Sequence, residues 1–445
     1  MQEKTYLKWY NKVGYGSGDI AGNVVYAFLS SFVMIYLTDT AGMNAGIVGT
    51  LMLLSKLFDG VTDIFFGSMI DRTNTRMGKA RPWMFWGYFG CAATLIAVFA
   101  IPPSLGESAK YAWFFIAYTL LNAVFYTANN IAYSALTALI TRNGSERVQM
   151  GSIRFMFAFG TGLLIQAVTV DFVKMLGGGA SGWRTAAIIY ALIGLAVNSL
   201  SVFSVRELPP KEQEETNASE KLGPSETLRL LAANKYYLII CCVYILTQLF
   251  TATLNMGIYF MTYILGNASL LGVFSLAINI PMIAGLVLTP FLVKKLGGMY
   301  RLNLAGYALS VAARGLVIAG GYLGSLPMML VFSGVASIGM SPLQGDLSAL
   351  IATCSEYTFR TQGKRIDGTM YSCTSLGVKL GGGVGVALAG WMLDASGYIA
   401  NAAVQPASCI NMLYFMYLWL PLIFNLVITF LLSRLRVEQA TEQLA

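Results

Sequence analysis

The chain has 445 residues, of which 56% are hydrophobic and 11% are charged, and its mean hydropathy is +0.64. Soluble domains carry about a quarter charged residues, so this composition excludes a soluble fold and indicates a protein with many membrane-spanning segments. The 29 Lys and Arg outnumber the 21 Asp and Glu and give a net charge of +8. We assign this charge to membrane topology and lipid headgroups, and we expect no nucleic-acid partner.

The chain contains no histidine, and its six cysteines lack the spacing of metal ligands. A proton carrier in this protein must therefore be a carboxylate or, less plausibly, a tyrosine or cysteine. No metal cluster or phosphate-binding loop is recognisable, so we do not expect an enzyme or an organic cofactor. The N-terminal residues 1–12 are polar and basic, and we expect no cleaved signal peptide.

Hydropathy predicts twelve helical spans, each about as long as a bilayer crossing requires. A long polar stretch at 205–235 divides them into six and six, so we expect an N-terminal bundle (1–204), a cytoplasmic central loop (205–235) and a C-terminal bundle (236–445). The predicted spans are 13–38, 45–70, 83–102, 111–140, 150–173, 184–204, 236–264, 269–293, 302–322, 326–352, 368–393 and 410–433.

Basic residues set the expected orientation. Most Lys and Arg fall on one side of the membrane when the N-terminus, the exits of the even-numbered spans and the C-terminus share that side, so both termini are predicted to be cytoplasmic. Short basic turns follow both the second and the eighth span, GSMIDRTNTRMGK and TPFLVKKLGGMYR. Two six-helix halves joined by a polar loop are typical of the all-α major facilitator fold, in which the halves rock about a central site.

The first span contains GYGSGDIAGN, in which Asp19 and Asn23 lie one helical turn apart among glycines. Such small residues let another helix or a ligand approach the backbone closely. Asp19 has two interpretations: it contributes to a binding site, or it lies near the cytoplasmic mouth as a structural partner for a loop arginine.

The second span places Lys56, Asp59 and Asp63 at spacings of three and four residues, so their side chains share one helical face. Ionisable residues inside a membrane segment usually mark an ion or substrate path. The alternative is a structural ion pair with Lys56. Because two acids against one lysine leave a negative charge, we expect Asp59 and Asp63 to bind a coupling cation.

The fourth span contains FYTANNIAYSAL, in which Tyr126, Thr127 and Asn130 are predicted to share a face. Their hydroxyl and amide groups can bind a hard cation through oxygen or hydrogen-bond a sugar hydroxyl. Hydrogen bonding between neighbouring helices is an equally good interpretation for any one of them.

Three cations lie within later spans. Arg154 is about one turn inside the cytoplasmic end of the fifth span, and we expect it to pair with the second-span acids or an anionic substrate unless it snorkels to the interface. Lys379 lies deep in the eleventh span, one turn after Ser375, and requires an acid or a ligand carboxylate. Arg314 is equally deep in the ninth span, and its sequence context does not assign it to the site.

These motifs resemble those of the glycoside-pentoside-hexuronide:cation symporters, a family of the major facilitator type. The resemblance extends over nearly the whole chain, through VGYGSGDIAGN, KLFDGVTDIFFGSMIDRTNTRMGKARPW, YTANNIAYSALTALIT and GKRIDGTMYSCTSLGVKLGGG. It implies a multi-pass protein of the bacterial cytoplasmic membrane that imports a glycoside together with a cation by alternating access.

The resemblance also implies roles for individual residues. It assigns the coupling-cation site to Asp59, Asp63, Thr62, Thr127 and Asn130. It assigns the sugar site to Asn23, Tyr126, Asn130, Ser134, Arg154, Ser375 and Lys379. The loop after the second span resembles the cytoplasmic latch of major facilitator transporters, which makes Asp71, Arg72, Arg76 and Lys79 the expected gating residues.

The sequence departs from the family members that carry neutral galactosides. Those members have aspartates at the positions of Asn23 and Asn130 and a tryptophan at the position of Ser134. A carboxylate at these positions repels a substrate carboxylate, and an amide does not. With Arg154 and Lys379 retained, the pattern favours an anionic hexuronide or glucuronide, as in the glucuronide permease branch, which also shares SGYIAN at 396–401. A neutral pentoside or glucoside is the alternative, and a lysolipid is a more distant one.

The same change bears on the ion. With Asn130 in place of that aspartate, a sodium site loses one anionic ligand, although the amide oxygen of Asn130 can still coordinate the ion. Clustered acids in a dry site raise one pKa toward neutrality, so a proton is the expected coupling ion and Na+ at Asp59 and Asp63 is the alternative. The expected partners are the sugar and the lipid bilayer, and the expected functional unit is a monomer.

Overall fold

The computed structural model describes residues 5–141, 143–209, 224–363 and 367–444. These residues fold almost entirely into helices, ten of which are long and apolar enough to cross a membrane. The chain divides into two compact units. The first is Met1–Ser219 with Ile399–Ala403, and the second is Glu220–Tyr398 with Val404–Ala445.

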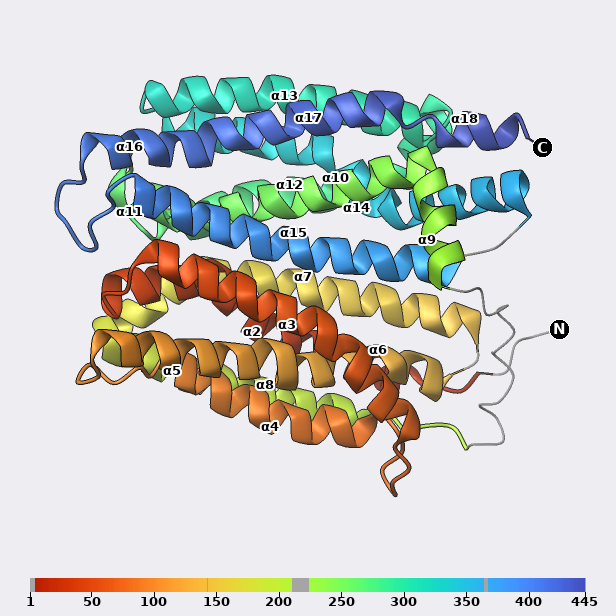
Figure 1. The fold of residues 1–445 in the computed structure, drawn as a ribbon, viewed down its shortest axis with the longest axis horizontal. Helices are drawn as coiled ribbons and strands as arrows, with labels where there is room; N and C mark the ends of the chain where they lie inside the picture. The colour runs from red at the N-terminus through yellow and green to blue at the C-terminus, as the bar shows by residue number, and fades with distance from the viewer. Residues whose placement is uncertain (1–4, 142, 210–223, 364–366, 445) are drawn as a thin grey trace. The chain divides into compact units, whose positions relative to one another are not determined.

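The first unit contains the predicted spans one to six (Figure 1). Two of them are irregular, because π-helical segments end the first span and interrupt the fourth. The elements are α1 (Trp9–Gly16), α2 (Gly18–Ile35), η1 (Tyr36–Thr40), α3 (Ala45–Arg72), α4 (Arg81–Val98), α5 (Glu107–Thr119), η2 (Leu120–Tyr126), α6 (Thr127–Ile140), α7 (Gly144–Met175) and α8 (Gly179–Ser204).

The break between α1 and α2 lies in the glycine-rich sequence of the first span. A Cβ atom on Gly16 would lie 2.6 Å from Ile153 Cγ2, and one on Gly18 would lie 2.7 Å from the ring of Tyr133. Only glycine allows these approaches, because a real Cβ does not come so close to its neighbours. The glycines therefore pack the first span against α6 and α7, as the sequence indicated.

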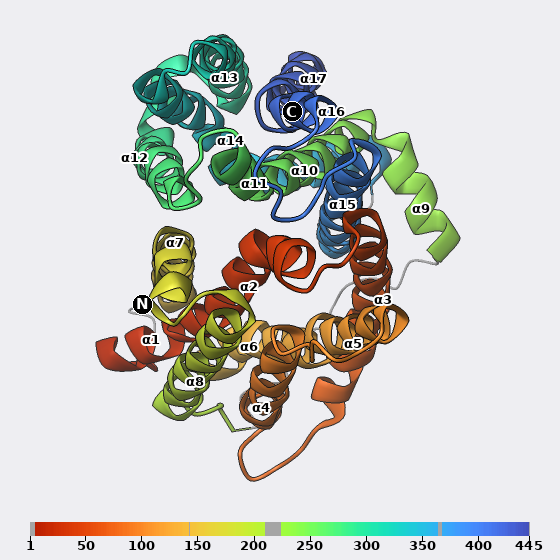
Figure 2. The ribbon, with the colours of Figure 1, turned by 90° about the vertical axis from the view of Figure 1, so that its left-hand side faces the viewer.

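The second unit contains the remaining predicted spans, and Figure 2 shows its helices end on. The elements are α9 (Pro224–Ala233), α10 (Lys235–Asn255), α11 (Gly257–Tyr263), α12 (Leu270–Leu296), α13 (Met299–Tyr322), α14 (Leu326–Gln362), α15 (Asp367–Ala395), α16 (Ala407–Tyr414), η4 (Phe415–Trp419), α17 (Leu420–Arg434) and α18 (Val437–Glu442).

Two elements differ from the hydropathy prediction. Helix α14 extends ten residues past the predicted end at 352, because Cys354 and Thr358 are buried and the Asn234 amide donates to both of them. Helix α9 lies inside the stretch predicted as a polar loop, and its Leu230 and Leu231 are buried. Both segments are amphipathic, so a search for uniformly apolar runs does not find them.

Helices α4 and α15 cover the predicted spans 83–102 and 368–393, but they are not among the ten apolar helices. Arg81 and Pro82 lower the mean hydropathy of α4. Several side chains of α15 lie outside the described residues, so the apolar length of this helix is not counted in full. Their assignment as membrane spans stays a prediction.

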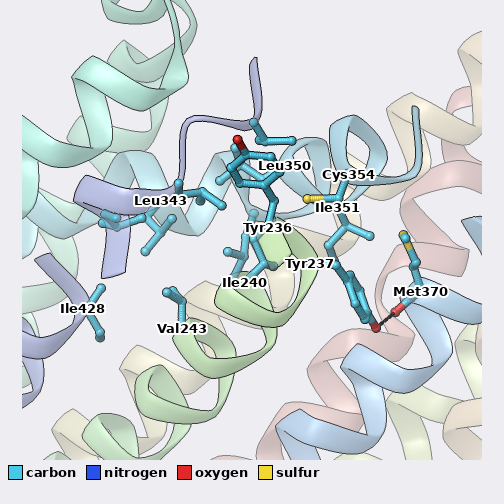
Figure 3. Packing of buried hydrophobic residues seen from close by; sticks show 14 of the residues in the cluster. Tyr236, Tyr237, Ile240, Val243, Leu343, Leu350, Ile351, Cys354, Met370 and Ile428 are labelled. Atoms are coloured by element: carbon cyan, nitrogen blue, oxygen red, sulfur yellow. Dashed lines mark hydrogen bonds between the residues drawn. The ribbon is translucent and has the colours of Figure 1, made fainter. Parts of the chain in front are cut away.

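The core of the second unit lies where α10, α14, α15 and α17 meet (Figure 3). Ile240, Val243, Leu350 and Ile428 are buried there. The hydroxyl of Tyr237 donates to the carbonyl oxygen of Met370 at 2.8 Å and so joins α10 to α15. Buried polar groups in a membrane protein need such partners, because no water is available to replace them.

In each unit, a glutamate that follows the sixth predicted span of that unit caps the N-terminus of the helix that forms its third span, which is α4 in the first unit and α13 in the second. Glu207 accepts hydrogen bonds from the backbone N–H groups of Lys79, Ala80 and Arg81 at 2.7, 2.9 and 3.1 Å. Glu438 accepts from Met299 and Tyr300 at 3.1 and 2.8 Å. A carboxylate at a helix N-terminus satisfies free N–H groups and interacts favourably with the helix dipole.

A glycine makes room for the carboxylate in each case. Gly78 has φ +110° and Gly298 has φ +130°, and a Cβ on either would contact the glutamate. The basic turns that follow the second and eighth spans thus share a positive-φ glycine that lies against a capping glutamate.

Replacing either glutamate with alanine leaves backbone donors at a helix start without an acceptor. We expect Glu207→Ala and Glu438→Ala each to destabilise the protein by about 1–3 kcal/mol. Thermal unfolding of the purified protein in detergent measures the effect, with Glu442→Ala on the exposed end of α18 as the matched control. An unchanged Tm in both variants would show that these caps contribute nothing to stability.

Candidate functional site

Asp59 in α3 is a buried acid, with 5% of its surface exposed. The hydroxyl of Thr127 donates a hydrogen bond to Asp59 Oδ1, and Thr127 Oγ1 also lies 2.8 Å from the carbonyl oxygen of Asn122. Lys56 Nζ is 4.0 Å from Asp59 Oδ2, which is beyond hydrogen-bond distance. The carboxylate thus has a hydroxyl donor and an ammonium group nearby.

The π-helical segment η2 immediately precedes Thr127. A π-turn adds a residue to the helix and turns the residues after it, and such turns are frequent at functional sites. Thr127 is buried against Asp59, whereas Asn130 is exposed and makes no hydrogen bond with a described residue. The structure therefore places these two residues in different surroundings, although the sequence predicted one shared face.

The other predicted cation ligands lie on α3. The Thr62 hydroxyl donates within its own helix, to the carbonyl oxygens of Phe58 and Asp59 at 3.2 and 3.1 Å. Asp63 is half-buried one turn after Asp59. Thr62 keeps its oxygen lone pairs available, so it can still accept from a hydrated ion or coordinate one.

Arg154 in α7 pairs with Asp19 in α2. Its Nε donates to Asp19 Oδ2 at 2.6 Å, and its Nη1 lies 3.4 Å from the Tyr15 hydroxyl and 3.3 Å from Thr137 Oγ1. The Arg154 and Asp19 side chains are 21% and 17% exposed, so water screens this charge-assisted bond only in part. The expected pairing of Arg154 with the second-span acids is therefore wrong, and the partner of Asp19 is a helical arginine and not the expected loop arginine. Spacing along one helix does not reveal which helices meet.

Two tyrosines complete the surroundings of this pair, and the sequence analysis did not identify them. The guanidinium carbon of Arg154 lies 4.1 Å from the centre of the Tyr133 ring and 5.8 Å from that of Tyr15. The Tyr133 hydroxyl also donates to Asp19 Oδ2 at 3.0 Å. Tyr133 follows Tyr126 by seven residues in the fourth span, and this helical repeat of tyrosine was the available signal.

The predicted sugar ligands of the first unit lie on α2, η2, α6 and α7. Asn23 donates to the carbonyl oxygen of Asp19 in its own helix at 2.9 Å. Tyr126 is half-buried, and Asn130 and Ser134 are exposed at spacings of four residues. These three side chains form a polar stripe along η2 and α6 that the bundle does not cover.

In the second unit, Lys379 is half-buried in α15, and the side chain of Ser375 lies outside the described residues. Glycines 377, 381 and 385 pack α15 against α10, with a Cβ on Gly381 reaching within 3.1 Å of the Ile245 carbonyl oxygen. Lys379 is two residues from Gly377 and Gly381, so it projects from the face opposite to this contact.

The predicted gating residues lie at the end of α3 and in the following loop. Arg72 and Arg76 are exposed, Lys79 is half-buried, and the Asp71 side chain lies outside the described residues. The contact that fixes this loop is the one from Lys79 N to Glu207.

Comparisons with known proteins agree with these features. The family model described as MFS/sugar transport protein matches residues 14–439. The chain is 30% identical over 427 residues to the isoprimeverose transporter of Lactiplantibacillus pentosus, covering 94% of this chain and 87% of that protein. It is 28% identical over 415 residues to the glucuronide carrier protein homolog of Escherichia coli K12, covering 90% of this chain and 86% of that protein.

The chain belongs to the glycoside-pentoside-hexuronide:cation symporter family. The crystal structure of a D-xylose-proton symporter superimposes with a TM-score of 0.65 at 15% identity, covering 95% of this symporter and 97% of that chain, which confirms the major facilitator fold. The protein is thus a multi-pass transporter of the bacterial inner membrane and not an enzyme. The count of twelve spans and the cytoplasmic termini stay predictions.

The pair of Arg154 and Asp19 should contribute to the stability of the symporter. Asp19→Asn removes the charged acceptor at 2.6 Å and leaves a partly buried guanidinium, so we expect a loss of about 2–3 kcal/mol. In a double-mutant cycle with Arg154→Gln, the two losses should not add, with a coupling of at least about 1 kcal/mol.

Thermal unfolding in detergent measures all four proteins of the cycle. Tyr133→Phe, which removes one hydroxyl donor to the same carboxylate, is the control for a neutral hydrogen bond and should cost less. Additive losses would show that Arg154 and Asp19 act independently.

Proposed function

We propose that the symporter imports an anionic hexuronide, such as a glucuronide, together with a proton. The observation that carries this proposal is the buried Asp59 carboxylate, which accepts a hydrogen bond from the Thr127 hydroxyl and whose Oδ2 lies 4.0 Å from Lys56 Nζ. An ionised acid in such a place is costly unless it is neutralised, so it favours binding of a proton or a small cation.

Arg154 supports an anionic substrate. Its hydrogen bonds within the described residues use Nε and Nη1, so Nη2 remains for a ligand carboxylate. A planar guanidinium is well suited to bind a carboxylate through such a group. The amides of Asn23 and Asn130 fit the same substrate class, because they do not repel a negative charge. The similarity to a glucuronide carrier protein homolog is consistent with this choice.

A proton is favoured over sodium by the ligands near Asp59. A sodium ion needs several oxygen ligands, and Asn130, one of the predicted ones, is exposed and not bonded to Asp59. A proton needs only the carboxylate. Sodium bound at Asp59 and Asp63 remains the competing proposal, with the Thr62 oxygen as a further ligand.

The transport cycle follows from the cost of a buried charge. The cation enters first and neutralises the acids of α3, the sugar acid then binds at Arg154, and the loaded carrier changes its conformation. A carrier with the acids ionised and no cation does not cross, because it would occlude an uncompensated charge. Because Arg154 is held by Asp19, the cation need not release it from the α3 acids.

A neutral pentoside is the second candidate substrate. The observation in its favour is the 30% identity to an isoprimeverose transporter, which is higher than the 28% identity to the glucuronide carrier homolog. Asn23, Tyr126 and Ser134 can all hydrogen-bond a neutral sugar. The two candidates differ in their need for Arg154.

Uptake of a radiolabelled glucuronide into membrane vesicles tests the function directly. With an imposed pH gradient, alkaline inside, we expect accumulation above equilibrium, by about tenfold per pH unit for one proton per sugar. A protonophore should abolish it, and a sodium gradient should not replace it.

Competition separates the substrates in the same assay. Excess unlabelled glucuronide should block uptake, and a xyloside should not. Uptake of a radiolabelled xyloside with no uptake of glucuronide would establish the second candidate, and no transport of either sugar would refute both.

Asp59→Asn should abolish accumulation while leaving exchange of labelled for unlabelled sugar, since the amide is permanently neutral and carries no proton. The steady-state gradient is expected to fall at least tenfold. Asp171→Asn, on an exposed part of α7, is the matched control and should accumulate normally. Concentrative uptake by Asp59→Asn would remove Asp59 from the coupling role.

A further inference from the structure

A stripe of polar residues runs through the interior of the second unit along α13. Asn303, Tyr307, Ser310 and Arg314 follow one another at spacings of four, three and four residues and so share one helical face. All four are buried, with 2%, 0%, 0% and 3% of their surfaces exposed. Arg314 is the only one of the four that carries a charge.

Arg314 packs against aromatic rings and not against an acid. Its guanidinium carbon lies 5.3 Å from the centre of the Phe250 ring. Its Nε is buried and has no hydrogen-bond partner, and no ion pair or hydrogen bond joins Arg314 to a described residue. A single phenylalanine ring compensates a buried guanidinium only weakly.

The nearest acids are several helical turns away. Helices α10, α12 and α17 and the segment η4, which surround α13 together with α14, contain no Asp or Glu. Of the acids in α14, Asp346 lies beside Asn303, which is eleven residues or about 16 Å along α13 from Arg314. Glu438 caps α13 at Met299, still farther away. At such separations these acids do not neutralise the arginine.

A second unpaired donor lies near the arginine. Tyr417 lies in η4, which packs against α13; it is 7% exposed, and its hydroxyl makes no hydrogen bond with a described residue. Its ring is held by Phe260, with the ring centres 4.7 Å apart. The backbone is irregular here, because η4 is π-helical. The Tyr417 ring also packs closely against Gly257 at the start of α11, where a Cβ atom would lie 2.7 Å from the ring.

We propose that Arg314 and Tyr417 bind a monovalent inorganic anion, such as chloride, inside the C-terminal bundle. A guanidinium has only donors, and a phenol hydroxyl can donate its proton, so a small anion can accept hydrogen bonds from both and neutralise the buried charge. The site is independent of the proposed transport function, since neither residue is among the predicted cation or sugar ligands. It is a structural anion site that stabilises the second unit.

Anion-dependent thermal unfolding tests this proposal. The purified protein is compared in sodium chloride and in sodium gluconate, at equal sodium concentration and ionic strength, because gluconate is too large for a buried site. We expect the Tm of the wild type to rise with chloride, by about 2 °C or more over a hundredfold range. Arg314→Gln should remove the dependence, and Tyr417→Phe should weaken it.

Arg434→Gln, at the exposed end of α17, is the matched control and should keep the full chloride dependence. No dependence in the wild type, or the same dependence in Arg314→Gln, would overturn the proposal. If Arg314→Gln cannot be purified, crystals grown in bromide decide the question. An anomalous peak within contact distance of the Arg314 guanidinium supports the site, and the absence of such a peak contradicts it.

Discussion

A charge inside a membrane protein must find its compensation within the protein or in a bound ion, and this constraint organises the structure. Asp59 illustrates it most clearly. The acid is 5% exposed and receives a hydrogen bond from Thr127, while Lys56 stays at 4.0 Å. A buried carboxylate with a hydroxyl donor and an ammonium group beside it is suited to bind and release a small cation.

The buried and half-buried cations of the two units meet the same constraint in different ways. Arg154 is paired with Asp19 and enclosed by Tyr15 and Tyr133, so its position is fixed while part of the guanidinium stays available. Arg314 has only an aromatic ring and a neighbouring phenol. Two glutamates, Glu207 and Glu438, act outside the spans by capping one helix in each unit. Arg154 is therefore held in place and can still donate to a ligand, whereas the described residues offer Arg314 no acidic partner.

The class of protein, the family and most helices could be predicted from the sequence, because hydropathy and motifs are local properties. The glycines at 16 and 18 were correctly expected to allow close packing. Contacts between helices could not be predicted in the same way. The choice of Asp19 over Asp59 as the partner of Arg154 depends on which helical faces meet, and the burial of Thr127 follows a π-turn that has no simple sequence signal. The cap by Glu207 depends on a contact across more than a hundred residues.

The central claim is that a cation bound at Asp59 is linked to the binding of the sugar. Isothermal titration calorimetry of the purified symporter with a glucuronide, in buffers that differ in their enthalpy of ionisation, measures this linkage directly. The account predicts that about one proton is taken up for each sugar bound near neutral pH. A binding enthalpy that is the same in every buffer, together with an affinity that does not change with sodium, would contradict it.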